Sequence, residues 1–384
     1  MMIKVIYSTD CIKYPLTGIG RYAYELAKTI QYEHSDVDLK FMHGLKVLDE
    51  LTNAKEKQTS SQNLKRSLQN SKVVSDIYRN IYPLAKSFVL KKHKKTIYHG
   101  TNFYLPPRVD NTISTFHDLS VFHWPQCHPA GRVHLMQKEL ANAINRTRMI
   151  LTVSEFIKKE IVEYFDVNPE KVIVSPLGYN EQFRPREQFE LAEVLSKYNL
   201  KYKSYSLYTG TIEPRKNLLA ILKAYGNINI GIRKQYPLVI SGYKGWDNDN
   251  IYKLIDKGQR EGWVTYLGYV PSAELPLLYN GATAFLFPSI YEGFGLPVLE
   301  ALASGTPVIC SSAASLPEVY GEAALSHDPD DVDKICAHLE RVISDSILRE
   351  NLKTQGIERA KLFSWSRCAN QTVIAYKRVA ENLC

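Results

Sequence analysis

The chain has 384 residues, of which 45% are hydrophobic and 23% are charged. These proportions are typical of a globular protein and argue against a disordered chain or a fibrous repeat, and the length favours two domains over one compact core. The six cysteines lack paired short spacings, so neither a disulfide framework nor a zinc site is expected. The apolar stretch at the start is too short for a signal peptide and no run reaches membrane-spanning length, which predicts a cytoplasmic protein.

Positive charge is concentrated in the first half of the chain. The formal net charge is +8, and residues 1–180 hold 25 Lys+Arg against 17 Asp+Glu, so this half accounts for the whole excess. Much of it falls between residues 55 and 95, where an apolar stretch runs into a basic cluster at 91–95. Such a segment could rest on an anionic membrane or receive an acidic lipid-linked substrate, but a solvated helix face with a basic end explains it equally well. Nucleic acid is not expected as a partner, because no recognised binding motif accompanies the charge.

Short apolar runs rich in β-branched residues alternate with longer amphipathic stretches, and the alternation occurs twice. This pattern is typical of βαβ units and predicts an α/β fold with two doubly wound, Rossmann-like parallel sheets. In the first half, strands are expected near residues 3–7, 39–43, 96–98, 113–116, 150–153 and 172–175, and helices near residues 20–30, 64–92, 132–145 and 155–164. In the second half, strands are expected near residues 206–208, 238–240, 264–267, 284–287 and 308–310, and helices near residues 218–227 and 274–280.

Turn-forming residues at 176–185 interrupt this periodicity and separate the two predicted domains. The first domain is expected to comprise residues 1–178 and the second residues 179–365, with a last helix over 366–384. A polar stretch at residues 55–63 is predicted to be a mobile loop. Because ligands bind at the carboxyl ends of parallel strands in such folds, a cleft between the two sheets is the expected binding site.

A glycine-rich segment with Gly18 and Gly20 precedes the first predicted helix. It fits the dinucleotide fingerprint Gly-x-Gly-x-x-Ala superficially, but the first strand ends near Ser8 and no acidic residue ends the second strand near His43, so the context is poor. Further on, His117 and Asp118 follow a predicted strand, where a histidine can reach a ligand bound at the carboxyl ends of the strands. A satisfied structural histidine is the alternative.

Two cations, Arg215 and Lys216, follow the first strand of the second half and stand at the start of a predicted helix. Fixed cations at such a place can stabilise the negative charge that develops on a departing diphosphate without a metal ion. The alternative is a pair of ordinary surface residues. The segment Asp247-Asn248-Asp249 imitates a metal-binding motif, but these residue types favour helix caps, and no metal is expected.

The segment from Phe285 to Gly305 combines an apolar strand, a loop with Gly293 and Gly295, and a helix that opens at Leu296. Glycines let a ligand approach the backbone, and the first amides of a helix carry partial positive charge, which suits a phosphate. The segment therefore predicts a phosphate-binding turn.

Two carboxylates, Glu292 and Glu300, bracket this turn. Apolar neighbours surround Glu300, and an unpaired buried carboxylate would cost several kcal/mol, so Glu300 needs a partner such as the vicinal hydroxyls of a ribose. The alternative is that Glu292 is a solvated loop acid and Glu300 belongs to an ion pair in the core.

The spacing of Glu292 and Glu300, with seven residues between them, resembles the acidic signature of the family 4 retaining glycosyltransferases. This resemblance covers nearly the whole chain, and it implies the GT-B fold, with an N-terminal acceptor-binding domain, a C-terminal domain that binds the nucleotide sugar, and a terminal helix that crosses back onto the first domain. The Glu-Pro-Arg-Lys-Asn sequence that contains Arg215 and Lys216 is common among mannosyltransferases of this family. One departure is Thr211, since many relatives carry arginine directly after the preceding glycine.

The resemblance also implies roles for individual residues. Glu292 would contact the donor sugar and Glu300 the ribose, while His117 contacts a sugar hydroxyl or the acceptor and Asp118 orients the loop. The remaining donor-binding residues would be the cations and the backbone around the diphosphate and the nucleobase: Gly18, Gly20, Arg215, Lys216, Tyr269, Val270, Gly293, Phe294, Gly295 and Leu296.

The expected function is that of a retaining glycosyltransferase, which moves a hexose, mannose from GDP-mannose, onto a glycan or lipid-linked polysaccharide acceptor. No cofactor is expected besides the nucleotide-sugar substrate. Three alternatives stay open: a family member that uses a UDP-sugar, an NAD-dependent dehydrogenase that uses the Gly18 loop, and a sugar-nucleotide binding protein without catalysis.

Overall fold

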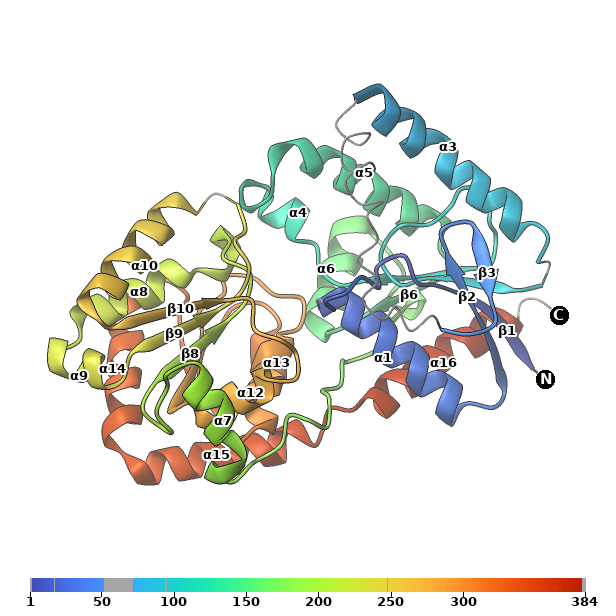
Figure 1. Cartoon of the computed structure of the whole chain (residues 1–384). Helices are drawn as coiled ribbons and strands as arrows, with labels where there is room; N and C mark the ends of the chain where they lie inside the picture. Colours follow the sequence, from blue (N-terminus) through green and yellow to red (C-terminus); the bar gives the residue numbers. More distant parts are fainter. Residues whose placement is uncertain (1, 17, 52–71, 94, 247, 382–384) are drawn as a thin grey trace.

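Two β-sheets, each covered by helices, form two lobes that lie side by side (Figure 1). The computed structural model describes residues 2–16, 18–51, 72–93, 95–246 and 248–381. The loop predicted at 55–63 and the first part of the helix predicted at 64–92 lie outside the described residues. Because both sheets are built from parallel strands joined by helices, the predicted class of two Rossmann-like α/β units is confirmed.

The N-terminal lobe is built on a seven-stranded sheet in the order β3-β2-β1-β4-β5-β6-β7. Its strands are β1 (Ile3–Ser8), β2 (Val37–His43), β3 (Lys46–Leu48), β4 (Ile97–Gly100), β5 (Thr112–Phe116), β6 (Met149–Thr152) and β7 (Val172–Val174). All neighbours are parallel except β3, which turns back antiparallel to β2. The predicted strands of this half are confirmed. The sequence does not predict β3, because three partly exposed residues carry no periodic signal.

The C-terminal lobe is built on a six-stranded parallel sheet in the order β10-β9-β8-β11-β12-β13. Its strands are β8 (Ser206–Thr209), β9 (Leu238–Ser241), β10 (Val264–Gly268), β11 (Ala284–Phe287), β12 (Val308–Ser311) and β13 (Ala324–His327). The five strands predicted in this half are confirmed. The edge strand β13 is an addition that the sequence does not predict, since its residues are only partly buried and alternate weakly.

Helices pack on both faces of each sheet (Figure 1). In the N-terminal lobe they are α1 (Gly18–Glu33), α3 (Lys72–Leu90), α4 (Ser120–His123), α5 (Ala130–Arg146) and α6 (Glu155–Phe165), with short 3-10 turns η1 (Pro125–Cys127) and η2 (Pro169–Lys171). In the C-terminal lobe they are α7 (Gln188–Lys197), α8 (Leu218–Asn227), α9 (Ile230–Gln235), α10 (Asp249–Glu261), α11 (Leu275–Gly281), α12 (Leu296–Ala303), α13 (Leu316–Tyr320), α14 (Val332–Ser344) and α15 (Ser346–Ala360), with the 3-10 turn η3 (Pro214–Lys216). No helix in the described part of the chain is long and apolar enough to span a membrane.

The strands are buried along their length because helices cover both faces of the sheets. Every residue of β4, β5, β8 and β11 is buried. A strand that is covered on both faces needs apolar or well-paired residues at successive positions rather than at alternate ones, and the sequence Ala-Phe-Leu-Phe of β11 meets that need. Continuous apolar runs were therefore the appropriate signal for these strands.

The last helix, α16 (Trp365–Glu381), returns to the N-terminal lobe and packs on α1 and on strands of the first sheet. Its Tyr376 hydroxyl is hydrogen-bonded to His99 Nδ1 at 2.8 Å inside the core. The chain segments that join the lobes cross tightly, since a Cβ added at Gly178 would meet the backbone nitrogen of Trp365 at 2.2 Å. The division into domains at residues 178 and 365 stays a prediction.

Candidate active site

The loops at the carboxyl ends of the two sheets meet at the interface between the lobes. The loop after β11 approaches the end of β5 so closely that a Cβ on Gly293 would meet the carbonyl oxygen of His117 at 1.8 Å. Ser154 Oγ, at the start of α6, donates a hydrogen bond to the Gly293 carbonyl at 2.8 Å. The carboxylate of Glu318 accepts the backbone amides of Glu155 and Phe156 at 2.8 and 2.6 Å. The lobes are therefore in contact at the predicted phosphate-binding turn.

Glu292 forms a buried ion cluster with the two predicted cations. Its carboxylate lies 2.5 Å from Lys216 Nζ and 3.1 Å from Arg215 Nη1. Arg215 also pairs with Glu213 at 2.8 Å and donates a hydrogen bond to the Tyr291 carbonyl at 2.7 Å. The structure thus brings Arg215, Lys216 and Glu292 together, and the alternatives of a solvated Glu292 and of surface cations are wrong.

The electrostatics of this cluster keep Glu292 ionised. Burial alone would raise the pKa of the Glu292 carboxyl, but the charges of Lys216 and Arg215 and a hydrogen bond from Lys216 outweigh burial and lower the pKa to about 2. Lys216 is further held over the ring of Phe287, 5.3 Å from its centroid. Two fixed cations of this kind can bind an anion, and in this structure the Glu292 carboxylate is the anion that they bind.

Tyr291 is a site residue that the sequence analysis missed. Its side chain, from the loop after β11, is buried within the apolar core cluster of the N-terminal lobe. The hydroxyl accepts a hydrogen bond from the Leu119 amide at 3.1 Å and donates one to Glu160. Tyr291 directly precedes Glu292 in the chain. The packing of Tyr291 in the other lobe therefore helps to fix the position of the Glu292 backbone. The sequence offered one indication of this role, namely an aromatic residue directly before the first glutamate of the acidic motif.

Glu300 is also buried, but it already has protein partners. Its Oε1 lies 2.9 Å from Nη1 of Arg21, which comes from the other lobe, and its Oε2 accepts a weaker hydrogen bond from Tyr279 at 3.4 Å. The ion-pair alternative therefore describes this structure, although the pair lies between the lobes. Burial raises the pKa of the Glu300 carboxyl to about 7, against the opposing effects of Arg21 and Tyr279.

The predicted helix at the end of the glycine turn is α12, and its first amides face no capping side chain. Gly295 is the N-cap residue in the left-handed region with φ 108°, which favours glycine. The carbonyls of Glu292 and Phe294 both accept hydrogen bonds from Ser315 Oγ, at 2.7 and 3.2 Å, and this fixes the turn before Leu296. An uncapped helix N-terminus of this kind can receive an anion.

His117 and Asp118 lie beside this turn, at the carboxyl end of β5. His117 Nε2 is hydrogen-bonded to the Thr101 carbonyl at 3.0 Å, and the ring packs edge-on against Tyr22. Burial lowers the pKa of His117, so the ring is neutral and donates to Thr101. Asp118 Oδ1 accepts the amide and the hydroxyl of Ser120 at 2.9 and 2.6 Å. Asp118 thereby holds its loop in place.

The other predicted residues lie around this centre. Gly20 packs against the Cys11 carbonyl, whereas Gly18 faces open space. Val270 is buried, whereas Tyr269 is 43% exposed. The ring of Tyr269 stacks on the ring of Tyr243, with centroids 4.9 Å apart, and the sequence analysis did not predict this contact. Tyr269 thus packs on another exposed tyrosine after β9 rather than on a predicted site residue.

Asn248 and Asp249, from the segment that imitates a metal-binding motif, stand at the start of α10. Asn248 stands at the N-cap position of α10, but its side chain donates to the Ile212 carbonyl at 2.9 Å and does not cap the helix. The predicted side-chain cap is therefore wrong for Asn248, because its side chain makes no hydrogen bond to the first amides of α10. Residue 247 lies outside the described part.

A cavity of about 750 Å³ opens in the N-terminal lobe next to Thr101, the residue whose carbonyl is hydrogen-bonded to His117. It is bounded by α3 and by the ends of β1 and β4. Aromatic and polar side chains line it, among them Asp10, Tyr82, Lys86, Tyr98, Asn102 and Tyr104. Aromatic faces combined with carboxylate and amide groups suit a polyhydroxylated ligand.

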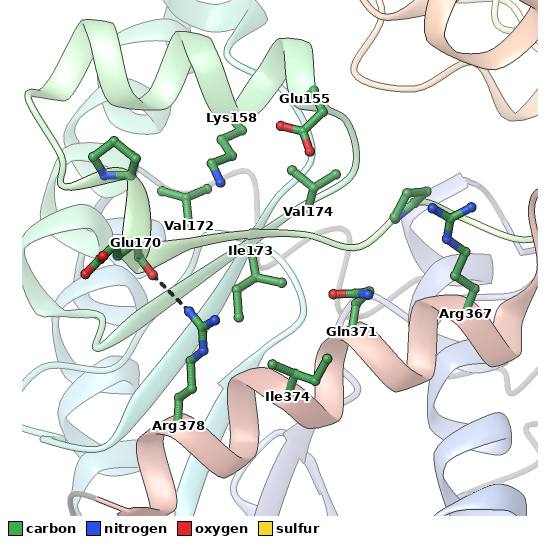
Figure 2. Close-up of a pocket in the computed structure, with 12 residues that line it drawn as sticks. Glu155, Lys158, Glu170, Val172, Ile173, Val174, Arg367, Gln371, Ile374 and Arg378 are labelled. Carbon is green, nitrogen blue, oxygen red and sulfur yellow. Dashed lines mark hydrogen bonds between the residues drawn. The ribbon is translucent and has the colours of Figure 1, made fainter.

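A second hollow, of about 530 Å³, lies between α6, β7 and α16 (Figure 2). Charges of both signs line it, and Arg378 reaches across to the Glu170 carbonyl at 3.4 Å. None of the residues predicted from the sequence lines this hollow, and none of its lining residues is hydrogen-bonded to His117, in contrast to Thr101 in the first cavity.

The contact at Gly293 predicts that Gly293→Ala separates the lobes. The new methyl group cannot share space with the His117 carbonyl, so the interface must open by displacing this loop. Small-angle X-ray scattering should show a larger radius of gyration than for the parent. Gly226→Ala is the control, because a Cβ there meets nothing within 4 Å. Identical scattering curves for Gly293→Ala and the parent would contradict the expectation.

The lowered pKa of Glu292 predicts a stability difference that depends on pH. With a folded pKa of about 2 and an ordinary value of 4.5, Glu292 stabilises the fold above pH 4.5, and this contribution falls as the pH drops towards 2. From pH 5 to pH 3 the parent should lose on the order of 2 kcal/mol more unfolding free energy than Glu292→Gln, measured in urea. Glu322→Gln, at an exposed position, should follow the parent. Parallel curves for Glu292→Gln and the parent would refute the ionised, paired state.

The chain is similar to known glycosyltransferases along its whole length. The model of the family described as glycosyl transferases group 1 matches residues 194–359. The chain is 43% identical over 379 residues to O-antigen chain mannosyltransferase B of Escherichia coli, covering 98% of this chain and 100% of that protein. It is 28% identical over 279 residues to O-antigen chain mannosyltransferase RfbU of Salmonella typhimurium, covering 70% of this chain and 72% of that one.

The fold has close counterparts among solved structures. The catalytic domain of starch synthase IV from Arabidopsis thaliana, bound to ADP and acarbose, superposes with a TM-score of 0.72 at 15% identity, covering 99% of this chain and 100% of that one. This likeness concerns the fold, whereas the full-length relative at 43% identity concerns the family. The chain therefore belongs to the group 1 glycosyltransferases, the family 4 enzymes of the GT-B fold, within their mannosyltransferase-like subgroup.

Proposed function

We propose that the chain is a retaining, metal-independent glycosyltransferase that transfers mannose from GDP-mannose to a glycan or lipid-linked polysaccharide acceptor. The observation that carries the proposal is the buried cluster in which Lys216 and Arg215 hold Glu292 beside the start of α12. Cations at fixed positions stabilise a departing diphosphate, and a carboxylate accepts hydrogen bonds from sugar hydroxyls. Membership of the family makes an NAD-dependent dehydrogenase an unsuitable alternative.

Donor binding exchanges the partners of the cluster. Without a donor, Glu292 and Glu213 together balance the charges of the two cations. When the donor binds, its diphosphate contacts Lys216, Arg215 and the amides from Gly293 to Leu296, and the Glu292 oxygens released from the cations turn to the sugar. Glu300 accepts hydrogen bonds from the ribose, and the backbone at Tyr269 and Val270 meets the nucleobase. This exchange leaves no buried charge without a partner.

The transfer step takes place on one face of the sugar. The bond between the anomeric carbon and the diphosphate oxygen breaks as the acceptor hydroxyl attacks from the same side. The proton of that hydroxyl passes to the leaving phosphate oxygen, so the charges balance without a metal ion. We assign no carboxylate as a nucleophile. His117 lines the donor face, and Asp118 keeps its loop in place.

The choice of mannose and of a glycan acceptor rests on the relatives. Those at 43% and 28% identity are named O-antigen chain mannosyltransferases. The acceptor would enter the cavity next to Thr101. The tyrosines and carboxylates that line this cavity suit sugar rings. A UDP-sugar donor and a binding protein without catalysis stay as alternatives, which a donor panel separates.

The exposed side chains of helix α3 support a location at the cytoplasmic face of an anionic membrane. Its Ile81, Leu84 and Phe88 are 59%, 44% and 73% exposed and share one face, and Lys91 and Lys92 follow the helix. The residues between them, Tyr82, Pro83 and Lys86, line the acceptor cavity. An apolar face with an adjacent basic cluster binds anionic lipid surfaces. A lipid-linked acceptor would then meet the cavity at the membrane.

The site predicts that catalysis depends on Glu292 and Lys216. With GDP-mannose and mannose-terminated oligosaccharides, Glu292→Ala and Lys216→Ala should release nucleotide at least about 100-fold more slowly than the parent, because each removes a charge that acts on the transition state. Lys223→Ala, an exposed lysine on α8, should match the parent. Equal rates in all four proteins would remove the site assignment, and binding without release for any acceptor would favour the non-catalytic alternative.

The exposed face of α3 predicts binding to anionic vesicles. The parent should sediment with vesicles rich in phosphatidylglycerol but not with pure phosphatidylcholine, and added salt should weaken binding. Phe88→Ser should reduce binding roughly tenfold, since it removes a large apolar side chain from the contact. Ile347→Ser, equally exposed at 74% on α15 of the other lobe, is the matched control. Binding that ignores lipid charge, salt and Phe88 would contradict the membrane assignment.

A further inference from the structure

We propose that Arg21 is a donor-binding residue, which comes from the N-terminal lobe and moves from Glu300 to the diphosphate when the nucleotide sugar binds. The inference rests on the proposed function, because it assumes a nucleotide-sugar donor. It adds a ligand from the opposite lobe to a site whose assigned cations, Arg215 and Lys216, both come from the C-terminal lobe.

Arg21 is better placed than Arg215 to change partners. Within the described part of the chain, its guanidinium makes a single hydrogen bond, from Nη1 to Glu300 at 2.9 Å, although it has five N–H donors. Arg215 is committed to Glu213, Glu292 and the Tyr291 carbonyl. A guanidinium with free donors can take a phosphate without losing a structural role.

The position of Glu300 brings Arg21 next to the diphosphate. Glu300 is the proposed ribose ligand, and the ribose is covalently joined to the diphosphate. A guanidinium within 2.9 Å of that carboxylate therefore needs only a change of side-chain rotamer to reach a phosphate oxygen. As the hydroxyls of the ribose take over Glu300, the guanidinium becomes available to the phosphate.

Arg21 and Glu300 lie in helices that come from opposite lobes. Arg21 lies in the first turn of α1, which contains no acidic residue, and Glu300 lies in α12, whose own start has no capping side chain. The ion pair Arg21–Glu300 shows that these two helices meet. The positive end of the α1 dipole and Arg21 would therefore face the diphosphate together from the N-terminal lobe.

The charges of the site call for a further cation. Arg215 and Lys216 are matched by Glu213 and Glu292, so the cluster in the C-terminal lobe carries no net charge. A diphosphate adds several negative charges to this neutral cluster. Because burial raises the pKa of Glu300 to about 7, this carboxyl can bind a proton near neutral pH and release Arg21 with its full charge.

The test compares two ligands that differ only in the phosphates. Isothermal titration measures the affinity of guanosine and of GDP for the parent, Arg21→Gln, Arg21→Lys and Glu300→Gln. Arg21→Gln should weaken GDP binding roughly 10- to 100-fold and leave guanosine binding unchanged, because it removes a charged hydrogen bond to phosphate alone. Arg21→Lys should recover part of the loss. Glu300→Gln should weaken guanosine and GDP alike, through the ribose. Lys28→Gln, an exposed cation on the same helix, should match the parent.

The outcomes separate the inference from the proposed function. If Arg21→Gln binds GDP as the parent does, or weakens guanosine and GDP to the same extent, Arg21 only holds the lobes together and the inference is overturned. Guanosine binding also reports whether the variant is folded. If the parent binds neither guanosine nor GDP, the proposed GDP-mannose donor fails, and the inference fails with it for that separate reason.

Discussion

A buried carboxylate between two cations holds the candidate active site in shape. Taking Glu292, Lys216 and Arg215 out of water costs several kcal/mol for each charge, and their mutual pairing, together with the Arg215–Glu213 pair, compensates for it. Neither the turn after β8, which carries the cations, nor the turn after β11, which carries Glu292, can move alone without leaving a buried charge unpaired. The two turns therefore behave as one rigid unit, and the glycines around Gly293 bring the backbone of the other lobe against it.

Contacts between the lobes extend from this unit in two directions. Tyr291 inserts into the core of the N-terminal lobe, and Arg21 reaches back to Glu300 in the C-terminal lobe. Trp246 adds a hydrogen bond from its indole to the Cys127 carbonyl at 2.7 Å. Closed lobes exclude water from the reacting groups, which limits hydrolysis of an activated sugar. The same contacts also mean that an entering donor has to displace protein groups rather than solvent alone.

The sequence predicted well those features that depend on neighbouring residues. Continuous apolar runs indicated the strands correctly, since helices cover both faces of each sheet, and the cations and the glycine turn each lie within one connection between a strand and a helix. The sequence could not supply partners from distant elements. Burial around Glu300 required a partner, but Arg21 stands 279 positions away and meets it only because the two lobes close. For the same reason the role of Tyr291 was missed, although it lies inside the motif. Strands β3 and β13 were missed because short edge strands with partly exposed residues carry little local signal.

The returning helix α16 has a consequence for how the chain reaches its native state. Its Cys368, Thr372 and Tyr376 are fully buried against the first sheet, and Tyr376 supplies the hydroxyl that satisfies His99 in that core. The N-terminal lobe thus lacks one layer until α16 has left the ribosome, whereas the residues of the second sheet are all synthesised before that helix. Completion of the first lobe must therefore wait until residues 365–381 have emerged, long after its own sheet has been synthesised.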